Sequence, residues 1–144
     1  MAAIPLLGHT LPTRIVHGED AWVSKTGGAT SPDRWTPQRP LYRGAWMLPA
    51  GQTMRVPVVT GGDTVGLRIA ARREGPSARR LEVLADDQSI AIVELPGAPA
   101  EAWVEAEIEP FDWPEGATLV LRAPPTPRRP RGGAVIDRIE LTWR

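Results

Sequence analysis

The sequence predicts an all-β fold, an antiparallel β-sandwich of the jelly-roll type. Many short stretches alternate apolar with polar residues, which is the pattern of half-buried strands. Glycine and proline, 14 and 16 of the 144 residues, separate these stretches. No stretch has the periodicity of a convincing helix. Short strands at intervals of roughly 8–15 residues, divided by turn residues, are typical of antiparallel sandwiches and jelly rolls.

The N-terminal third of the chain differs from the rest. Residues 1–12 predict an extended arm, and residues 13–144 a single sandwich domain of ordinary size. Only Thr13–His17 and the short stretch 21–23 look like strands there. Residues 24–45 are rich in glycine, proline, serine and threonine and predict a long loop.

Strand patterns dominate from residue 53 onward. Met54, Val56 and Val58 alternate with Arg55 and Pro57, and the proline favours an edge strand because it cannot donate a ladder hydrogen bond. Further predicted strands carry their apolar residues at Val65, Leu67, Ile69 and Ala71, at Leu81 and Val83, at Ile90 and Ile92, at Val104, Ala106 and Ile108, and at Leu119 and Leu121.

The closing strand raises a question about Asp137. Counting every second residue places this carboxylate on one face with Val135, Ile139, Leu141 and Trp143. A buried carboxylate is costly unless it is paired. From the residues alone, Asp137 either caps backbone N–H groups or pairs with an arginine such as Arg14 or Arg138.

Composition excludes several classes of function. The 17 basic residues balance the 17 acidic ones, so no overall field favours nucleic acid or an anionic membrane. The absence of cysteine excludes disulfides, thiolate metal sites and cysteine nucleophiles. No apolar run reaches the ~20 residues of a membrane span, and no signal peptide is recognisable, so synthesis in a cytoplasm without export is expected. Many prolines and no asparagine suit a thermophile or a GC-rich genome equally.

No catalytic site is expected. The two histidines, His9 and His17, belong to neither a metal-ligand nor a triad spacing. Glu105, Glu107 and Glu109 project together from one strand face, which indicates a solvated or interface face rather than carboxyl groups opposed across a cleft. The sequence therefore predicts a protein that is not an enzyme.

Four segments together resemble the jelly-roll carbohydrate-binding modules. They are "HGEDAWVS" (17–24), "LPAGQTMRVPVVTGGDTVGLRIAARR" (48–73), "IVELPGAPAEAWVEAEIE" (92–109) and "AVIDRIEL" (134–141). Their order and spacing are similar to those of that family across roughly residues 13–144. Each motif is weak alone, and the series is more specific for the fold than for sugar binding.

The resemblance implies a structural calcium ion held by Glu19 and Asp137. Sugar-binding members usually carry an asparagine two residues before that aspartate, where this chain has Val135. Trp35, Tyr42 and Trp46 are candidate aromatic contacts, either with a sugar ring or with another subunit. The other expected role of tryptophan is core packing, which we expect for Trp103, Trp113 and Trp143.

Because the fold signature is kept while the ligand asparagine is absent, the sequence favours a structural role. The preferred hypothesis is a bacteriophage capsid decoration protein in the virion, which clamps capsid subunits and forms a homo-oligomer, such as a trimer. The arm would make these contacts through its apolar residues Ile4, Leu6, Leu7 and Leu11. The alternative hypothesis is a carbohydrate-binding module that recognises a glycan through loop aromatics.

Overall fold

The computed structural model describes residues 13–17, 23–31, 45–58, 64–74, 79–96, 103–125 and 133–143. These residues form strands and connecting turns without a helix, which confirms the predicted all-β class. No helix among them is long and apolar enough to cross a membrane. The strands are β1 (Thr13–His17), β2 (Ser24–Lys25), β3 (Ala29–Ser31), β4 (Ala45–Pro49), β5 (Thr53–Pro57), β6 (Thr64–Glu74), β7 (Arg80–Ala85), β8 (Gln88–Glu94), β9 (Val104–Asp112), β10 (Thr118–Arg122) and β11 (Gly133–Trp143).

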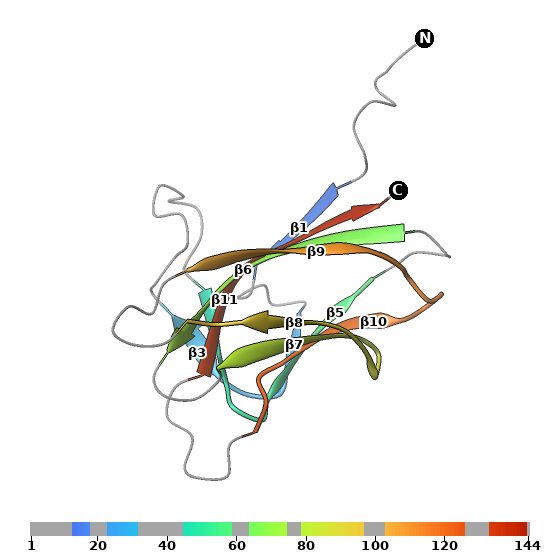
Figure 1. Ribbon diagram of the computed structural model, residues 1–144. Helices are drawn as coiled ribbons and strands as arrows, with labels where there is room; N and C mark the ends of the chain where they lie inside the picture. The colour runs from blue at the N-terminus through green and yellow to red at the C-terminus, as the bar shows by residue number, and fades with distance from the viewer. Residues whose placement is uncertain are drawn as a thin grey trace.

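The strands form two antiparallel sheets that face each other (Figure 1). The larger sheet has the order β3-β4-β11-β6-β9. On the same side of β11 as β4, β1 pairs with the later residues of that strand. The smaller sheet has the order β2-β5-β10-β7-β8. Neighbours in each sheet are mostly distant in sequence, as expected of a jelly roll.

A single hydrophobic core fills the space between the sheets. Side chains at alternate positions of both sheets enter it, among them Met54, Ile69 and Leu121, all fully buried. Trp113 is also buried, and its indole Nε1 donates a hydrogen bond to the carbonyl of Ala117 at 2.9 Å. The predicted alternation therefore identifies the core face of β5, β6, β7, β9 and β10.

The predicted loop 24–45 contains the short strands β2 and β3, while residues 32–44 lie outside the described residues. Two and three residues are too few for alternation to identify a strand. Because β2 covers part of β5, the predicted edge strand is an interior strand. In β5, only Met54 and Arg55 pair with β2, so Pro57 lies beyond the covered part and needs no donor there.

The apolar face of β8 differs from the prediction. Ile92 is 52% exposed, whereas its neighbour Val93 is buried. The cause is an irregularity in the pairing with β7, where Val83 pairs with Ala91 but Leu84 pairs with Ser89. The extra residue, Ile90, shifts the alternation by one position.

Asp137 is the extra residue of a β-bulge in β11. In the pairing with β6, Ile136 faces Ala71 and Arg138 faces Ala70, so the register shifts between them. A bulge adds one residue to one strand and moves the following side chains to the other face. Asp137 itself is 5% exposed.

The bulge corrects the predicted faces of the closing strand. Ala134 and Ile136 enter the core before it, and Ile139 and Leu141 enter the core after it. Val135 is fully buried but lies on the opposite face of the sheet from Ile136. The prediction that one face runs through Val135, Asp137 and Ile139 is therefore wrong.

Candidate functional site

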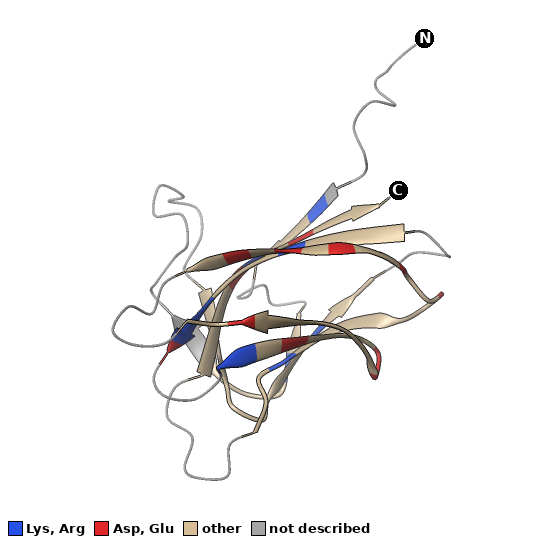
Figure 2. Cartoon of the chain, in the orientation of Figure 1, with Lys and Arg blue, Asp and Glu red and all other residues tan. Residues whose placement is uncertain are grey.

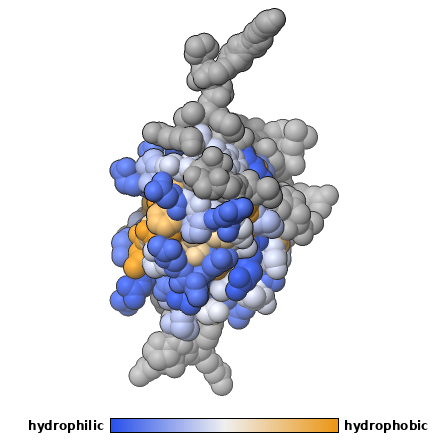
Figure 3. All heavy atoms as spheres, turned by 90° about the vertical axis from the view of Figure 1, so that its right-hand side faces the viewer, coloured by the Kyte–Doolittle hydropathy of each residue, from blue (hydrophilic) through white to orange (hydrophobic). Residues whose placement is uncertain are grey.

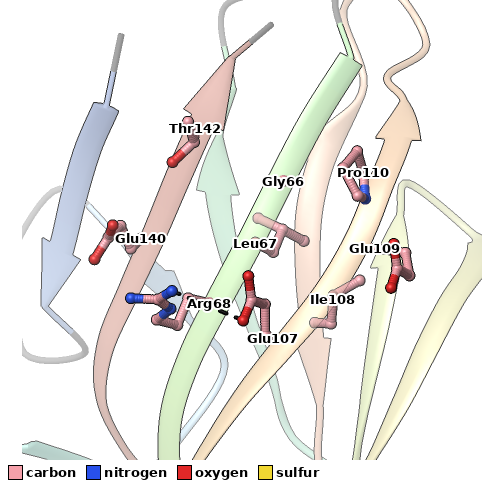
Figure 4. Close-up of a pocket in the computed structure, with 9 residues that line it drawn as sticks. All are labelled: Gly66, Leu67, Arg68, Glu107, Ile108, Glu109, Pro110, Glu140 and Thr142. Atoms are coloured by element: carbon pink, nitrogen blue, oxygen red, sulfur yellow. Dashed lines mark ion pairs between the residues drawn. The ribbon is translucent and has the colours of Figure 1, made fainter. Parts of the chain in front are cut away.

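The outer face of the larger sheet carries a hollow of about 440 Å³. Its side chains come from three adjacent strands (Figure 4). Cross-strand pairing places Glu140 of β11, Arg68 of β6 and Glu107 of β9 in one row. The next row pairs Thr142 with Gly66. Residues 68, 107 and 140 are far apart in sequence, so only the sheet brings them together.

The hollow has two causes, a glycine in the row next to Arg68 and an irregular pairing of β6 with β9. Gly66 has no side chain, so the sheet surface is open between Thr142 and β9. The pairing of β6 with β9 is irregular there, since Val65 faces Phe111 whereas Leu67 faces Ile108. Glycine within a strand and a local bulge are recognised signs of a backbone shaped for close approach.

Ion pairs hold the arginine of the hollow in place. Arg68 Nε lies 3.4 Å from Glu105 Oε1, and Arg68 lies 3.8 Å from the Oε2 atom of Glu107. Arg138 lies 2.9 Å from Glu140 Oε2 on the neighbouring strand. Figure 4 shows the Arg68 guanidinium between Glu140 and Glu107. The exposed pairs of Arg68 contribute little stability, about 0–1 kcal/mol each, but they orient the groups.

The hollow is acidic overall. Its lining contains one arginine, Arg68, and three glutamates, Glu107, Glu109 and Glu140. Figure 2 shows the acidic residues spaced along β9. Carboxylates accept hydrogen bonds, a guanidinium group only donates them, and a threonine hydroxyl does both. This set can bind a polyhydroxylated neutral ligand, whereas it would repel an anionic one.

A second area of interest lies around Val135, where the resemblance of the sequence to carbohydrate-binding modules led us to expect an asparagine. Arg72 is its cross-strand neighbour and is 6% exposed. The Arg72 guanidinium lies 5.7 Å from the ring centroid of Trp103 and also bonds Glu74 Oε1 at 3.1 Å. One face of this half-buried tryptophan is therefore covered by an arginine of the same chain.

The predicted aromatic contacts are only partly within the described residues. Trp46 packs against the core, and its Nε1 donates to the carbonyl of Gly27 at 3.1 Å. Lys25 Nζ lies 4.4 Å from the centroid of the same ring, so little of Trp46 is available to a ligand. The other predicted contacts, Ile4, Leu6, Leu7, Leu11, Trp35 and Tyr42, lie outside the described residues.

Only one of the two predicted calcium ligands, Asp137, lies within the described residues. Asp137 offers a buried carboxylate beside the junction of β1, β4 and β11, which suits a hard cation. Glu19 lies outside the described residues. Within the described ranges, no group of three or more histidine, cysteine, aspartate or glutamate residues could hold a metal ion.

Comparison with solved structures places this fold among carbohydrate-binding modules. The CBM36-1 domain of a multidomain xylanase from the hindgut metagenome of Trinervitermes trinervoides has a TM-score of 0.63 at 16% identity, with 90% of this chain and 96% of that chain covered. A family 35 module from Clostridium thermocellum has a TM-score of 0.60 at 15% identity, covering 90% and 97%. A CBM36 module in complex with calcium and xylotriose has a TM-score of 0.64 at 11% identity, covering 90% and 99%.

These similarities establish the jelly-roll fold of the carbohydrate-binding modules, and at such low identity they do not establish a ligand. No protein-family model matches the sequence. No curated protein is similar to it in sequence either. The resemblance drawn from the four sequence motifs is thus confirmed for the fold.

The sequence does not predict the hollow. Its two sequence signals are Gly66 within an alternating stretch and Pro110 directly after the three glutamates. Both signals mark an irregular strand, but neither identifies which strands lie next to each other.

Proposed function

We propose that the chain is a non-catalytic carbohydrate-binding protein that holds a neutral glycan against the outer-face hollow. The observation that carries this proposal is the row Glu140–Arg68–Glu107 beside the open space at Gly66. Fixed donors and acceptors around an open groove can hydrogen-bond several hydroxyl groups of one sugar. The fold shared with carbohydrate-binding modules supports the same function.

The outer face is a better candidate than the area around Val135. There, Arg72 covers one face of Trp103 and a valine replaces the expected asparagine. The hollow, in contrast, keeps its polar groups at the surface, with Arg68 and Glu107 both exposed. The proposed ligand therefore contacts the outer face of the larger sheet rather than the loop residues.

The test begins with affinity electrophoresis on a panel of neutral and acidic polysaccharides. Isothermal titration with oligosaccharides of the best neutral polymer then follows. We expect Arg68→Ala to weaken binding at least roughly tenfold, because each lost charge-assisted hydrogen bond contributes about 1.5–3 kcal/mol. Gly66→Leu should also weaken binding, because its side chain would occupy the hollow.

The matched control is Arg122→Ala, since Arg122 forms the corresponding exposed ion pair with Glu82 on the other sheet. This variant should bind like the wild type. Retained binding in both hollow variants would exclude the outer face as the site. Absence of binding to every glycan of the panel would overturn the proposed function.

We infer that a calcium ion, if bound, is held by Asp137 and Glu19 and serves a structural purpose. In support, Asp137 is a buried carboxylate, and one of the similar modules is a calcium complex. Bound calcium would stabilise the fold by mass action. Added calcium should therefore raise the melting temperature of the wild type but not that of Asp137→Asn, and an equal effect on both would contradict this site.

The virion function preferred from the sequence has no comparable support. Its proposed contacts, the arm 1–12 and most of the loop 24–45, lie outside the described residues. The similar structures reported above are carbohydrate-binding modules rather than virion proteins. We therefore prefer the carbohydrate-binding alternative, and nothing in the described residues supports the trimer that was expected with the virion function.

A further inference from the structure

One side of the sandwich carries β8 and β9, each of which is the outermost described strand at one edge of its sheet (Figure 1). A hollow of about 490 Å³ runs between them. Apolar residues supply most of its lining, including Ile90, Ile92, Val104 and Phe111. Hydrophobic side chains gather on the left of Figure 3, which is the side that faces the viewer in Figure 1, and hydrophilic side chains surround them. An exposed apolar area of this kind marks an interaction surface.

The edge formed by β9 is protected against further strand pairing. Glu105, Glu107 and Glu109 alternate along it, and all three are exposed. Pro110 lacks an N–H group and lies at the irregular pairing with β6. Charges, proline and bulges are the devices by which proteins prevent edge-to-edge association.

The edge formed by β8 lacks most of these devices. Its residues from Gln88 to Val93 carry no charge and include no proline. Ile92 is 52% exposed, and among the described residues only Ile15, at 43%, is also an exposed large hydrophobic residue. The bulge at Ile90 limits the regular part of this edge to the residues that follow.

The backbone of β8 also presents hydrogen-bonding groups outward. The Leu95 amide donates to the Arg79 carbonyl at 2.9 Å. Because antiparallel hydrogen-bonded pairs alternate, Val93 is directed toward β7, whereas Ile92 and Glu94 direct their amides and carbonyls away from it. These outward groups are placed to pair with another strand.

We propose that β8 pairs with β8 of a second copy of this chain, antiparallel and with the twofold axis at Ile92. This register places Ile92 opposite its own copy and Ala91 opposite Val93 of the second copy. Apolar side chains then meet at the axis, and the two glutamates never face each other, which avoids the cost of like charges. Pairing ends at Pro96, which has no N–H group.

A second copy fits this edge better than another partner because the strand is complementary to itself. Such a contact uses the same surface on both subunits and closes after two copies. The two smaller sheets would become one continuous sheet across the axis. This inference does not depend on glycan binding, since the outer-face hollow belongs to the other sheet.

The test is sedimentation equilibrium of the full chain over the micromolar to millimolar range. We expect a monomer–dimer equilibrium for the wild type. Ile92→Lys should weaken dimerisation at least roughly tenfold, because two like charges would meet at the axis. Since Ile92 is exposed, this variant should fold normally, which circular dichroism will verify.

The matched control is Ile15→Lys, which changes the other exposed isoleucine on β1 of the larger sheet. It should dimerise like the wild type. A monomer at every concentration would overturn the proposal, as would a trimer, or a dimer that Ile92→Lys leaves intact.

Cross-linking tests the register independently. The chain has no cysteine, so Ile92→Cys introduces a single thiol. A short bismaleimide should link two copies of this variant rapidly into a covalent dimer. Ile15→Cys should form such a dimer only slowly, through random collisions of monomers. Equal cross-linking of the two variants would show that β8 is not at the twofold axis.

Discussion

The two halves of β11, on either side of Asp137, show how one strand serves two environments. Before the bulge, all four residues from Gly133 to Ile136 are buried, and β4 and β6 flank them. After the bulge, Ile139 and Leu141 are buried, whereas Arg138, Glu140 and Thr142 are only half-buried. Here β1 replaces β4 as the neighbour on one side.

The difference teaches that the burial of a strand follows its neighbours rather than its own alternation. The first half is covered on both faces, which requires an uninterrupted apolar run, and Ala134–Ile136 supplies it. The second half has one outer face, which requires alternation. Asp137 separates the two patterns by adding one residue.

Insertion of one alanine between Arg138 and Ile139 would break this comparison most severely. The inserted residue moves every later side chain of β11 to the other face, so that Glu140 and Thr142 would point toward the core and Ile139 and Leu141 away from it. Burying charged groups without partners costs more than a typical domain can tolerate. We expect loss of the cooperative thermal transition, measured by circular dichroism and calorimetry.

The control is deletion of Asp137, which removes the extra residue but leaves Ile136 opposite Ala71 and Arg138 opposite Ala70, so that Ile139 and Leu141 still enter the core. It should retain a cooperative transition at reduced stability. An insertion variant that melts like the wild type would show that strand pairing does not determine the faces of β11.

Substitutions at two glycines test how closely the backbones of neighbouring strands approach in the two halves of β11. A Cβ atom on Gly133 would clash with the carbonyl oxygen of Leu48, a contact that requires β4 to move. A Cβ atom on Gly66, which pairs with Thr142 in the second half, would meet its nearest neighbour at 3.9 Å. Gly133→Ala should therefore lower the free energy of unfolding by several kcal/mol in urea denaturation, while Gly66→Ala should change it little. Similar losses for both would contradict the close approach of β4.

Alanine substitutions at Ile136 and Ile139 test whether the bulge shifts the alternation of inward and outward side chains along β11. Both side chains are fully buried in the core, although a regular strand would place them on opposite faces. Each substitution should cost about 2–5 kcal/mol in denaturant unfolding, as expected for removal of a buried large aliphatic side chain. A small effect for Ile136→Ala alone would indicate that Ile136 lies outside the core, as in a regular strand without a bulge.

The smallest effect is expected on the outer face of the second half. Glu140→Gln removes the charge that pairs with Arg138 at 2.9 Å and keeps the shape of the side chain. It should change the free energy of unfolding by at most about 1 kcal/mol, and less at high salt. A larger loss in urea denaturation would show that the second half also depends on its outer face.

Alternation in the sequence predicts much of the sandwich because most core strands have one solvated face. It succeeds for β6, where apolar core residues occupy every second position from Val65 to Ala71, and for β9, where apolar residues alternate with three glutamates. It fails at Ile92 and Asp137, because a bulge is a property of two paired strands and the partner is not apparent from either segment. The candidate hollow was missed for a similar reason, since Glu140, Arg68 and Glu107 become neighbours only through strand order.

The pairing of Thr13 with Thr142 has a mechanical consequence. The first and last described strands are antiparallel neighbours, so the described body is entered and left at one place (Figure 1). A force applied at these two residues would open the β1–β11 ladder one pair at a time instead of loading all its hydrogen bonds together. We therefore expect the first rupture in a pulling experiment to occur at low force and to release β1 alone, while the two-sheet core remains folded.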